Sequence, residues 1–268
     1  MQTTSVSIRR VSGRDSAVAD DVVVVEEPLE IRAAWMAGGE PRDKTISVTM
    51  RTPGDDEDLA AGFLFTEGLL RSAEEIESIR HWSSPNVIRV ALRDGARIDT
   101  GKLERHFYTT SSCGVCGKTS IEALRVSTSS QPKASHPVTT DLVHGLPQTL
   151  EEHQSAFRTT GGLDAAAVFD FGGAMLRSRE DIGRHNAVDK VIGSLLRDKR
   201  VPLSDSVLMV SSRGSFEIVQ KGIVGGIPVV ASVGAPSTLA IDLASEFGVT
   251  LLGFVRNERF NVYAGEVR

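Results

Sequence analysis

The sequence predicts an α/β protein whose second half carries a largely parallel sheet, preceded by a smaller α+β region. Three observations lead to this prediction. The 268 residues suffice for a sizeable core, strand and helix patterns alternate after residue 160, and a Ser- and Pro-rich stretch at 127–147 separates the two halves. The apolar runs of the first half are short and strand-like, which favours antiparallel strands there.

The alternation in the second half is regular. Alternating strands and helices imply right-handed crossovers between neighbouring parallel strands. The predicted elements are a strand at 165–171, a helix at 181–196, a strand at 207–210, a helix at 215–224, a strand at 228–233, a helix at 238–247 and a strand at 249–255.

Four segments are expected along the chain. Residues 1–20 lack periodicity and are predicted to form a flexible tail. The α+β region follows at 21–105, with one helix at 56–70 among its strands. Residues 106–147 hold a Cys-x-x-Cys loop, a short helix and a mobile linker, and 148–268 form the α/β core.

Composition excludes several classes of protein. The 30 basic and 35 acidic side chains give a net charge of -5, so no global attraction to nucleic acid or to an anionic membrane is expected. The longest apolar stretch, 223–235, is too short to span a membrane and is interrupted by glycine and proline. The N-terminus has no signal-peptide pattern, and two cysteines provide no disulfide framework. We therefore expect a soluble cytoplasmic protein.

Three connecting segments are predicted to leave the carboxyl ends of parallel strands, where open α/β sheets bind ligands. They are 211–214, 234–237 and 256–259. Two of them lead into helices, whose free amide groups and positive dipole end favour a phosphate. A nucleotide-like ligand is the functional interpretation, and tight turns built from small residues are the structural one.

A cysteine pair is the strongest chemical signal in the first half. Cys113 and Cys116 lie among Gly and Ser residues, with Lys118 nearby to favour the thiolate. A structural zinc site would need two more ligands, and a thioredoxin-like centre would lie early in its domain. Zinc deaminases carry His-x-Glu, which this sequence lacks, so no metal is predicted. A sulfur-carrying cysteine with a protecting or resolving neighbour fits best.

The helix predicted at 181–196 carries a polar pair near its start. His185 and Asp189 are four residues apart, beside the apolar stripe of that helix. A hydrogen bond donated by the His185 ring to Asp189 would orient the ring, as a base or ligand-binding pair requires. A histidine that merely packs the helix is the alternative.

Four segments together resemble the FdhD family of formate dehydrogenase accessory sulfurtransferases. The resemblance extends over about 45–263. Its motifs are RTPGDDED at 51–58, TTSSCGVCG at 109–117, REDIGRHNAVDK at 179–190 and SFEIVQK at 215–221.

This resemblance implies that sulfur passes from a cysteine desulfurase, through a persulfide, to the molybdenum or tungsten bis-guanine-dinucleotide cofactor of formate dehydrogenase. Cys113 matches the persulfide cysteine of the family and Cys116 its companion. The cofactor is cargo, and GDP-like nucleotides are expected in the same site. The partners implied are the desulfurase, the catalytic subunit of formate dehydrogenase and a second copy in a homodimer. The matching nucleotide-site residues are Phe254, Val255, Arg256, Asn257, Glu258 and Arg259.

The resemblance also implies a cytidine-deaminase-like mixed sheet sandwiched by helices. Two departures limit it. Asp164 stands where the histidine of a Gly-Gly-Leu-His motif is expected, so no role of that histidine is transferred to this chain. Residues 211–215, with the sequence Ser-Ser-Arg-Gly-Ser, replace a more usual Ser-Gly-Arg-Ala-Ser. Two other functions stay open: a chaperone that binds the cofactor or immature enzyme without covalent sulfur transfer, and a thiol oxidoreductase with a reversible Cys113–Cys116 disulfide.

Overall fold

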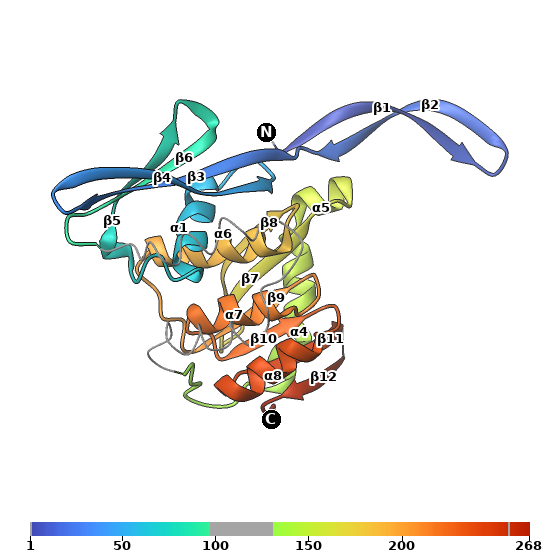
Figure 1. Cartoon of the computed structure of the whole chain (residues 1–268). Coiled ribbons are helices and arrows are strands. Elements are labelled where there is room, and N and C mark those ends of the chain that lie inside the picture. The colour runs from blue at the N-terminus through green and yellow to red at the C-terminus, as the bar shows by residue number, and fades with distance from the viewer. Residues whose placement is uncertain (1, 97–130, 257) are drawn as a thin grey trace.

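The centre of the protein is a mixed sheet in its second half, with strand order β12-β11-β10-β9-β7-β8 (Figure 1). It is seen in a computed structural model that describes residues 2–96, 131–256 and 258–268. The strands are β7 (Asp164–Asp170), β8 (Met175–Asp181), β9 (Ser206–Val210), β10 (Val229–Ser232), β11 (Thr250–Arg256) and β12 (Arg259–Ala264). The helices of this half are α4 (Thr140–Glu152), α5 (Ser155–Thr160), α6 (Arg184–Arg197), α7 (Phe216–Val224) and α8 (Thr238–Phe247).

The predicted α/β class is confirmed, but the sheet is less parallel than the alternation suggests. Strands β9, β10 and β11 are parallel, whereas β7 runs antiparallel to β9. The reason is an additional strand, β8, which forms a hairpin with β7. The crossover through α6 therefore joins β8, and not β7, to β9. Strand β12 is likewise additional and closes the other edge antiparallel to β11.

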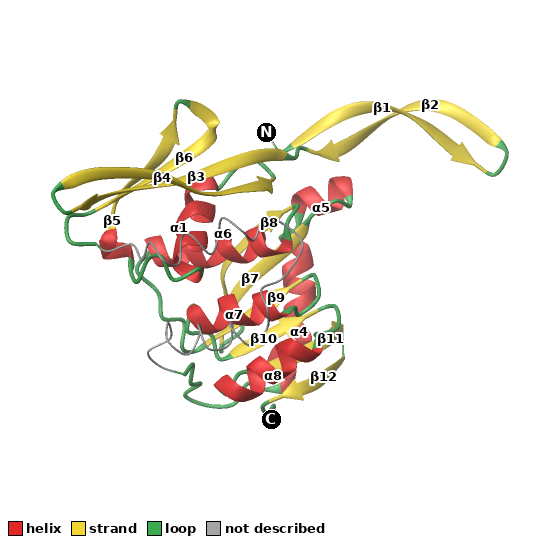
Figure 2. Cartoon of the chain, viewed as in Figure 1, coloured by secondary structure: helices red, strands yellow, loops and turns green. Residues whose placement is uncertain are grey.

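Both faces of this sheet are covered, as Figure 2 shows. Alternate residues of β7 point to opposite sides. Ala166 and Val168 belong to the core beneath α6, α7 and α8, whereas Ala167 and Phe169 belong to a second core beneath α4. A strand buried on both sides has to be apolar throughout, which explains the continuous run in β7.

Helix α4 occupies part of the segment where the sequence predicts a mobile linker, so that prediction is wrong from residue 140 onward. The Thr139 side chain caps the helix by accepting from the amide of Leu142. Val143, Leu146 and Leu150 are buried on one face at helical spacing. Pro147 lies inside the helix. Because proline is unfavourable in a helix interior, the sequence does not indicate a helix here.

The first half folds around a second sheet with strand order β4-β3-β6-β5. Its strands are β3 (Glu27–Ala37), β4 (Glu40–Arg51), β5 (Ile76–Trp82) and β6 (Ser84–Leu92), with α1 (Asp56–Thr66) and the short 3₁₀ helix η1 (Ala73–Glu75). Helix α1 lies between this sheet and α6, and one hydrophobic cluster runs through all these elements. The predicted helix at 56–70 ends early, at Thr66, because Gly68 adopts a positive φ.

Helices α1 and α6 cross at two glycines. A Cβ atom at Gly62 would lie 1.9 Å from the carbonyl oxygen of Asp189, and one at Gly193 would lie 1.9 Å from that of Asp58. Only glycine permits the two backbones to approach so closely. The contact fixes α6, and with it the residues at its N-terminus, against the first half of the protein.

Residues 3–24 form a long two-stranded ribbon, so the predicted flexible tail at 1–20 is wrong. Strands β1 (Thr3–Ser12) and β2 (Asp15–Val24) pair antiparallel along their whole length. A two-residue turn joins them, and Gly13 supplies the positive φ that such a turn needs at its first position. The polar composition of β1 conceals this strand in the sequence.

None of the helices in the described part of the chain has the length and apolar character that crossing a membrane requires.

Candidate functional site

The segments that follow β9, β10 and β11 meet at one edge of the six-stranded sheet, as the sequence predicts. This edge is the one formed by the carboxyl ends of these three strands. Backbone hydrogen bonds join them directly. The amide of Gly234 donates to the carbonyl of Ser212 at 3.0 Å, and the amide of Ser237 donates to that of Gly214 at 3.2 Å. This edge therefore presents a continuous surface of loop backbone, at the position where open α/β sheets bind ligands.

The end of β11 has an unusual backbone at this edge. Phe254 has a φ of 54°, and its amide donates to the carbonyl of Gly234 at 3.1 Å. Large side chains seldom adopt such a conformation, and residues that do so gather at functional sites. The Phe254 side chain is 39% exposed, Val255 is buried, and Arg256, Glu258 and Arg259 are exposed. Asn257 lies outside the described residues.

Helices α6 and α7 both begin at this edge, and neither has an acidic N-cap residue, although Glu217 lies in the first turn of α7. The first turn of α6 carries no acidic residue and starts instead with Arg184 and His185. Ser215 is the N-cap of α7, yet its hydroxyl makes no capping bond. The Arg184 Nε and the Ser215 Oγ are buried without a hydrogen-bond partner among the described residues. Cations and unpaired donors at the positive end of a helix favour an anionic ligand.

His185 lies between the two helix starts and pairs with Glu217 of α7. Its Nε2 is 2.8 Å from a carboxylate oxygen of Glu217, and both side chains are partly exposed. The bond to His185 lowers the pKa of Glu217, with further help from Arg184. The pair thus joins the N-termini of α6 and α7 beside Arg184, whose Nε has no hydrogen-bond partner among the described residues.

Asp164, the position where the family resemblance would place a histidine, lies at the same edge. It begins β7 and pairs with Asp181 at the end of β8. Partial burial raises the pKa of Asp164, while Arg184 and His185 act in the opposite direction. A carboxyl group therefore faces the same two basic residues from the neighbouring strand.

The predicted hydrogen bond between His185 and Asp189 is wrong. Asp189 is buried and binds the Lys221 Nζ at 2.9 Å through both carboxylate oxygens. Thr66 donates to the same carboxylate at 2.7 Å. Burial would favour a neutral lysine, but attraction to Asp189 and Glu67 outweighs this and raises the pKa of Lys221 to about 12. This buried pair connects α1, α6 and α7 and does not face the edge.

A second buried pair holds the loop after β4 against α6. The Lys190 Nζ lies 2.7 Å from Asp181, and both side chains are fully buried. Lys190 also donates to the carbonyl of Thr52 at 3.0 Å, while the amide of Thr52 donates to Asp181 at 3.2 Å. Asp181 further accepts from Asn186 at 3.0 Å. The start of α6 is therefore fixed before any ligand binds.

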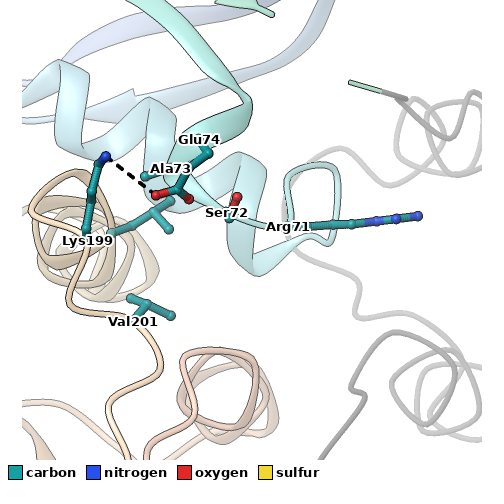
Figure 3. Close-up of a pocket in the computed structure, with 7 residues that line it drawn as sticks. Arg71, Ser72, Ala73, Glu74, Lys199 and Val201 are labelled. Atoms are coloured by element: carbon teal, nitrogen blue, oxygen red, sulfur yellow. Dashed lines mark ion pairs between the residues drawn. The ribbon is translucent and has the colours of Figure 1, made fainter. Parts of the chain in front are cut away.

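A shallow pocket elsewhere on the surface is a poorer candidate (Figure 3). It lies near the C-terminus of α6, at the opposite end of that helix from His185. Its one ion pair, between Lys199 and Glu74 at 3.6 Å, is largely exposed. Exposed pairs of this kind contribute little binding energy. The pocket is lined by Arg71, Ser72, Ala73, Glu74, Leu196, Lys199 and Val201.

Cys113 and Cys116 lie outside the described residues, so their predicted role stays a prediction. Sequence reasoning did not single out Arg184, Ser215 or Glu217 as site residues. One signal for Arg184 was available, because two basic residues at a helix start are electrostatically unfavourable unless they have an anionic partner. Glu217 gave no such signal, since its pairing with His185 depends on how α6 and α7 pack.

Comparison with known proteins connects this architecture to a family. A family model described as FdhD/NarQ matches residues 24–268. A sulfur carrier protein FdhD from Streptomyces coelicolor is 48% identical, over 95% of this chain and 92% of the relative. Another protein of that name, from Sulfurisphaera tokodaii, is 39% identical over 100% and 99%. A solved formate dehydrogenase accessory protein from Desulfotalea psychrophila shares the fold, with a TM-score of 0.77 at 24% identity, over 99% and 98% of the two chains.

Proposed function

The chain belongs to the FdhD/NarQ family, and we propose that it is a sulfur carrier which delivers sulfur to the cofactor of formate dehydrogenase. The observation that carries this proposal is the near full-length match to relatives named sulfur carrier protein FdhD. The Cys-x-x-Cys sequence at Cys113 and Cys116 supplies the thiols that such a carrier needs.

In the proposed first step, the Cys113 thiolate attacks the terminal sulfur of a persulfide on a cysteine desulfurase. The S–S bond of that persulfide breaks, the desulfurase cysteine leaves as a thiolate, and Cys113 becomes the persulfide. In the second step, which requires the bound cofactor as sulfur acceptor, the Cys116 thiolate attacks the Cys113 Sγ and the terminal sulfur leaves as hydrosulfide, which binds the metal of the cofactor. The two cysteines are thereby oxidised to a disulfide, which a dithiol reductant of the cell must reduce before the next cycle.

The proposed cargo is the bis-guanine-dinucleotide form of the molybdenum or tungsten cofactor. The segment Phe254–Arg259 is the proposed binding site for its nucleotide part, and a GDP-like nucleotide would bind there too. The unpaired donors of Arg184 and Ser215 support an anionic group beside it. Their place at the starts of α6 and α7 suits a diphosphate better than a neutral ring.

The remaining partners follow from the same family membership. We propose that a cysteine desulfurase supplies the sulfur, that the catalytic subunit of formate dehydrogenase receives the cofactor, and that the protein is a homodimer in the cytoplasm. Free Cys113 and Cys116 thiols require a reducing compartment. We further propose that the mixed sheet with helices on both faces is a cytidine-deaminase-like core.

A nucleotide-binding measurement tests the proposed diphosphate site. Replacing Arg184 with glutamine should weaken GDP binding roughly tenfold or more, because one charge-assisted hydrogen bond to phosphate contributes about 1.5–3 kcal/mol. Guanosine binding should change little. Titration calorimetry would show the difference, and Arg200→Gln is the matched control because Arg200 is exposed beyond the other end of α6. Equal GDP affinity in Arg184→Gln and wild type would refute the site.

An activation assay separates the carrier from a chaperone that binds the cofactor without transferring sulfur. Cys113→Ala should still bind GDP but should fail to activate inactive formate dehydrogenase when desulfurase, cysteine and reductant are present. If the protein is a chaperone, Cys113→Ala should both bind GDP and activate formate dehydrogenase. Full activation by Cys113→Ala would therefore reject the carrier and favour the chaperone.

A further inference from the structure

Asp164 is a carboxylate at the edge of the candidate site, and its backbone is firmly held. The amide of the next residue, Ala165, donates to the Ser211 hydroxyl at 2.8 Å, and the amide of Ser211 donates to the carbonyl of Ala165 at 2.9 Å. These bonds fix the start of β7 beside the loop that follows β9. The Asp164 side chain itself forms no hydrogen bond or ion pair with any residue that the structure describes.

The direction of the strand points this carboxylate toward the start of α6. Side chains alternate between the two faces of a strand, so Asp164 shares the face of Ala166, which belongs to the core beneath α6. Its cross-strand partner Asp181 lies on that face too. The charged side chains that act on Asp164 from β8 and α6 are Asp181, Arg184 and His185.

The other acidic groups near the start of α6 each have a basic partner. Asp181 binds the buried Lys190 at 2.7 Å, and Glu217 of α7 lies 2.8 Å from His185. The charge of Asp164 is not balanced in this way by any described residue. The proposed diphosphate site therefore contains a carboxylate that repels an anion, close to the Arg184 side chain that attracts one.

We propose that Asp164 determines which diphosphate this edge accepts, favouring one that is esterified at both ends over a free nucleoside diphosphate. The proposal rests on the proposed function and deepens it, because the diphosphate of a dinucleotide cofactor is esterified at both ends. Such a group carries about two negative charges at about pH 7.5, and the free terminal phosphate of GDP adds about one more. The repulsion from the Asp164 carboxylate is therefore larger for GDP.

The basic groups of the site would give the opposite preference if they acted alone. Arg184 and the amide groups at the starts of α6 and α7 attract the more highly charged ligand more strongly. A carboxylate beside them opposes this preference, and repulsion of the wrong ligand is a general source of specificity. Free guanine nucleotides then compete less with the cofactor. A histidine at this position, as the family resemblance would place there, lacks the negative charge on which this selection depends.

A comparison of two probes tests the proposal on the whole protein. GDP has a free terminal phosphate, whereas GDP-mannose has the same nucleotide with both phosphates esterified. Asp164→Asn should strengthen the binding of GDP more than that of GDP-mannose, so that the ratio of the two dissociation constants changes about fivefold or more in favour of GDP. Titration calorimetry at about pH 7.5 measures both constants. The contacts of the mannose ring cancel when the ratio is compared between variants.

Two further variants complete the test. Asp164→His should shift the ratio in the same direction, because it also removes the negative charge. Asp141→Asn is the matched control, since Asp141 is exposed at the start of α4, near the segment whose Ser135 amide binds Asp205 just before β9. That end of β9 lies at the opposite edge of the sheet, so the ratio should equal that of wild type.

The outcomes distinguish this proposal from the proposed function. If Asp164→Asn and Asp164→His bind both probes in the wild-type ratio, Asp164 does not select the ligand, although the diphosphate site stands. An equal shift in Asp141→Asn would mean that the effect reflects net charge alone, and would also overturn the proposal. If wild type binds neither probe, the diphosphate site itself is rejected and the role of Asp164 with it.

Discussion

Replacing Gly193 with alanine should destabilise the protein by about 3 kcal/mol or more, as expected when atoms are forced into a packed core. The added Cβ would lie 1.9 Å from the carbonyl oxygen of Asp58 in α1. The backbones of α1 and α6 would have to separate, and the packing between them would be lost. In an open helix the same substitution normally stabilises, by about 0.5–1 kcal/mol. The sign of the effect is therefore diagnostic.

Urea unfolding monitored by circular dichroism would measure this change. Gly145→Ala is the matched control, because Gly145 is exposed in α4 and a Cβ there would meet no other atom within 4 Å. That variant should be as stable as wild type or slightly more so. If Gly193→Ala also proved as stable as wild type, the close crossing of α1 and α6 would be incorrect.

Replacing Lys221 with methionine should cost about 3–5 kcal/mol, the usual penalty for leaving one partner of a buried ion pair uncompensated. Asp189 would keep its bond from Thr66 but lose its buried cation. Changing both residues, as Lys221→Met with Asp189→Leu, should recover part of the loss because no charge is then buried. Lys199→Met is the control, since Lys199 is 69% exposed.

The Lys221→Met variant should also respond to pH in a defined direction. Without the lysine, burial raises the folded-state pKa of Asp189 above its unfolded value, so protonation favours the folded state. The stability of the variant relative to wild type should therefore increase as pH falls and decrease as pH rises through that pKa. Denaturant unfolding at several pH values would measure this trend. If the difference in stability between the variant and wild type did not depend on pH, Asp189 would not be a buried carboxylate with a raised pKa.

Much of the second half was predictable because its strands are buried on both faces. Strands such as β9 and β10 must be apolar throughout, and helices α6 to α8 are amphipathic. Strand β8 escaped prediction because its residues, MLRSRED, are mostly polar and only half-buried. Its absence from the predicted order is also the reason that β7 was expected to run parallel to β9.

The ribbon and α4 were missed for different physical reasons. Strand β1 has little alternation because neither of its faces meets the core, so its pairing depends on β2 and on the turn at Gly13. Helix α4 has its apolar residues at helical spacing, but Pro147 argues against a helix when the sequence is considered alone. The core beneath the sheet stabilises this helix despite the proline.

The edge that holds the candidate site could be predicted, whereas its side-chain pairing could not. Chain order alone places the loops after β9, β10 and β11 together. By contrast, His185 pairs with Glu217 of another helix, and Asp189 forms an ion pair with Lys221. Periodicity shows which side of a helix a residue occupies but not which cation or carboxylate a neighbouring helix supplies. Several charged residues of the family motifs thus serve to hold the halves together.

The central claim is that Cys113 carries sulfur, and intact mass spectrometry of the protein after incubation with a cysteine desulfurase and cysteine tests it most directly. Wild type should gain about one sulfur atom in mass, as a persulfide forms on the attacking thiolate. The gain should disappear in Cys113→Ala and persist in Cys116→Ala, where the companion that releases the sulfur is missing. Absence of the gain in wild type with an active desulfurase, or its persistence in Cys113→Ala, would contradict the account.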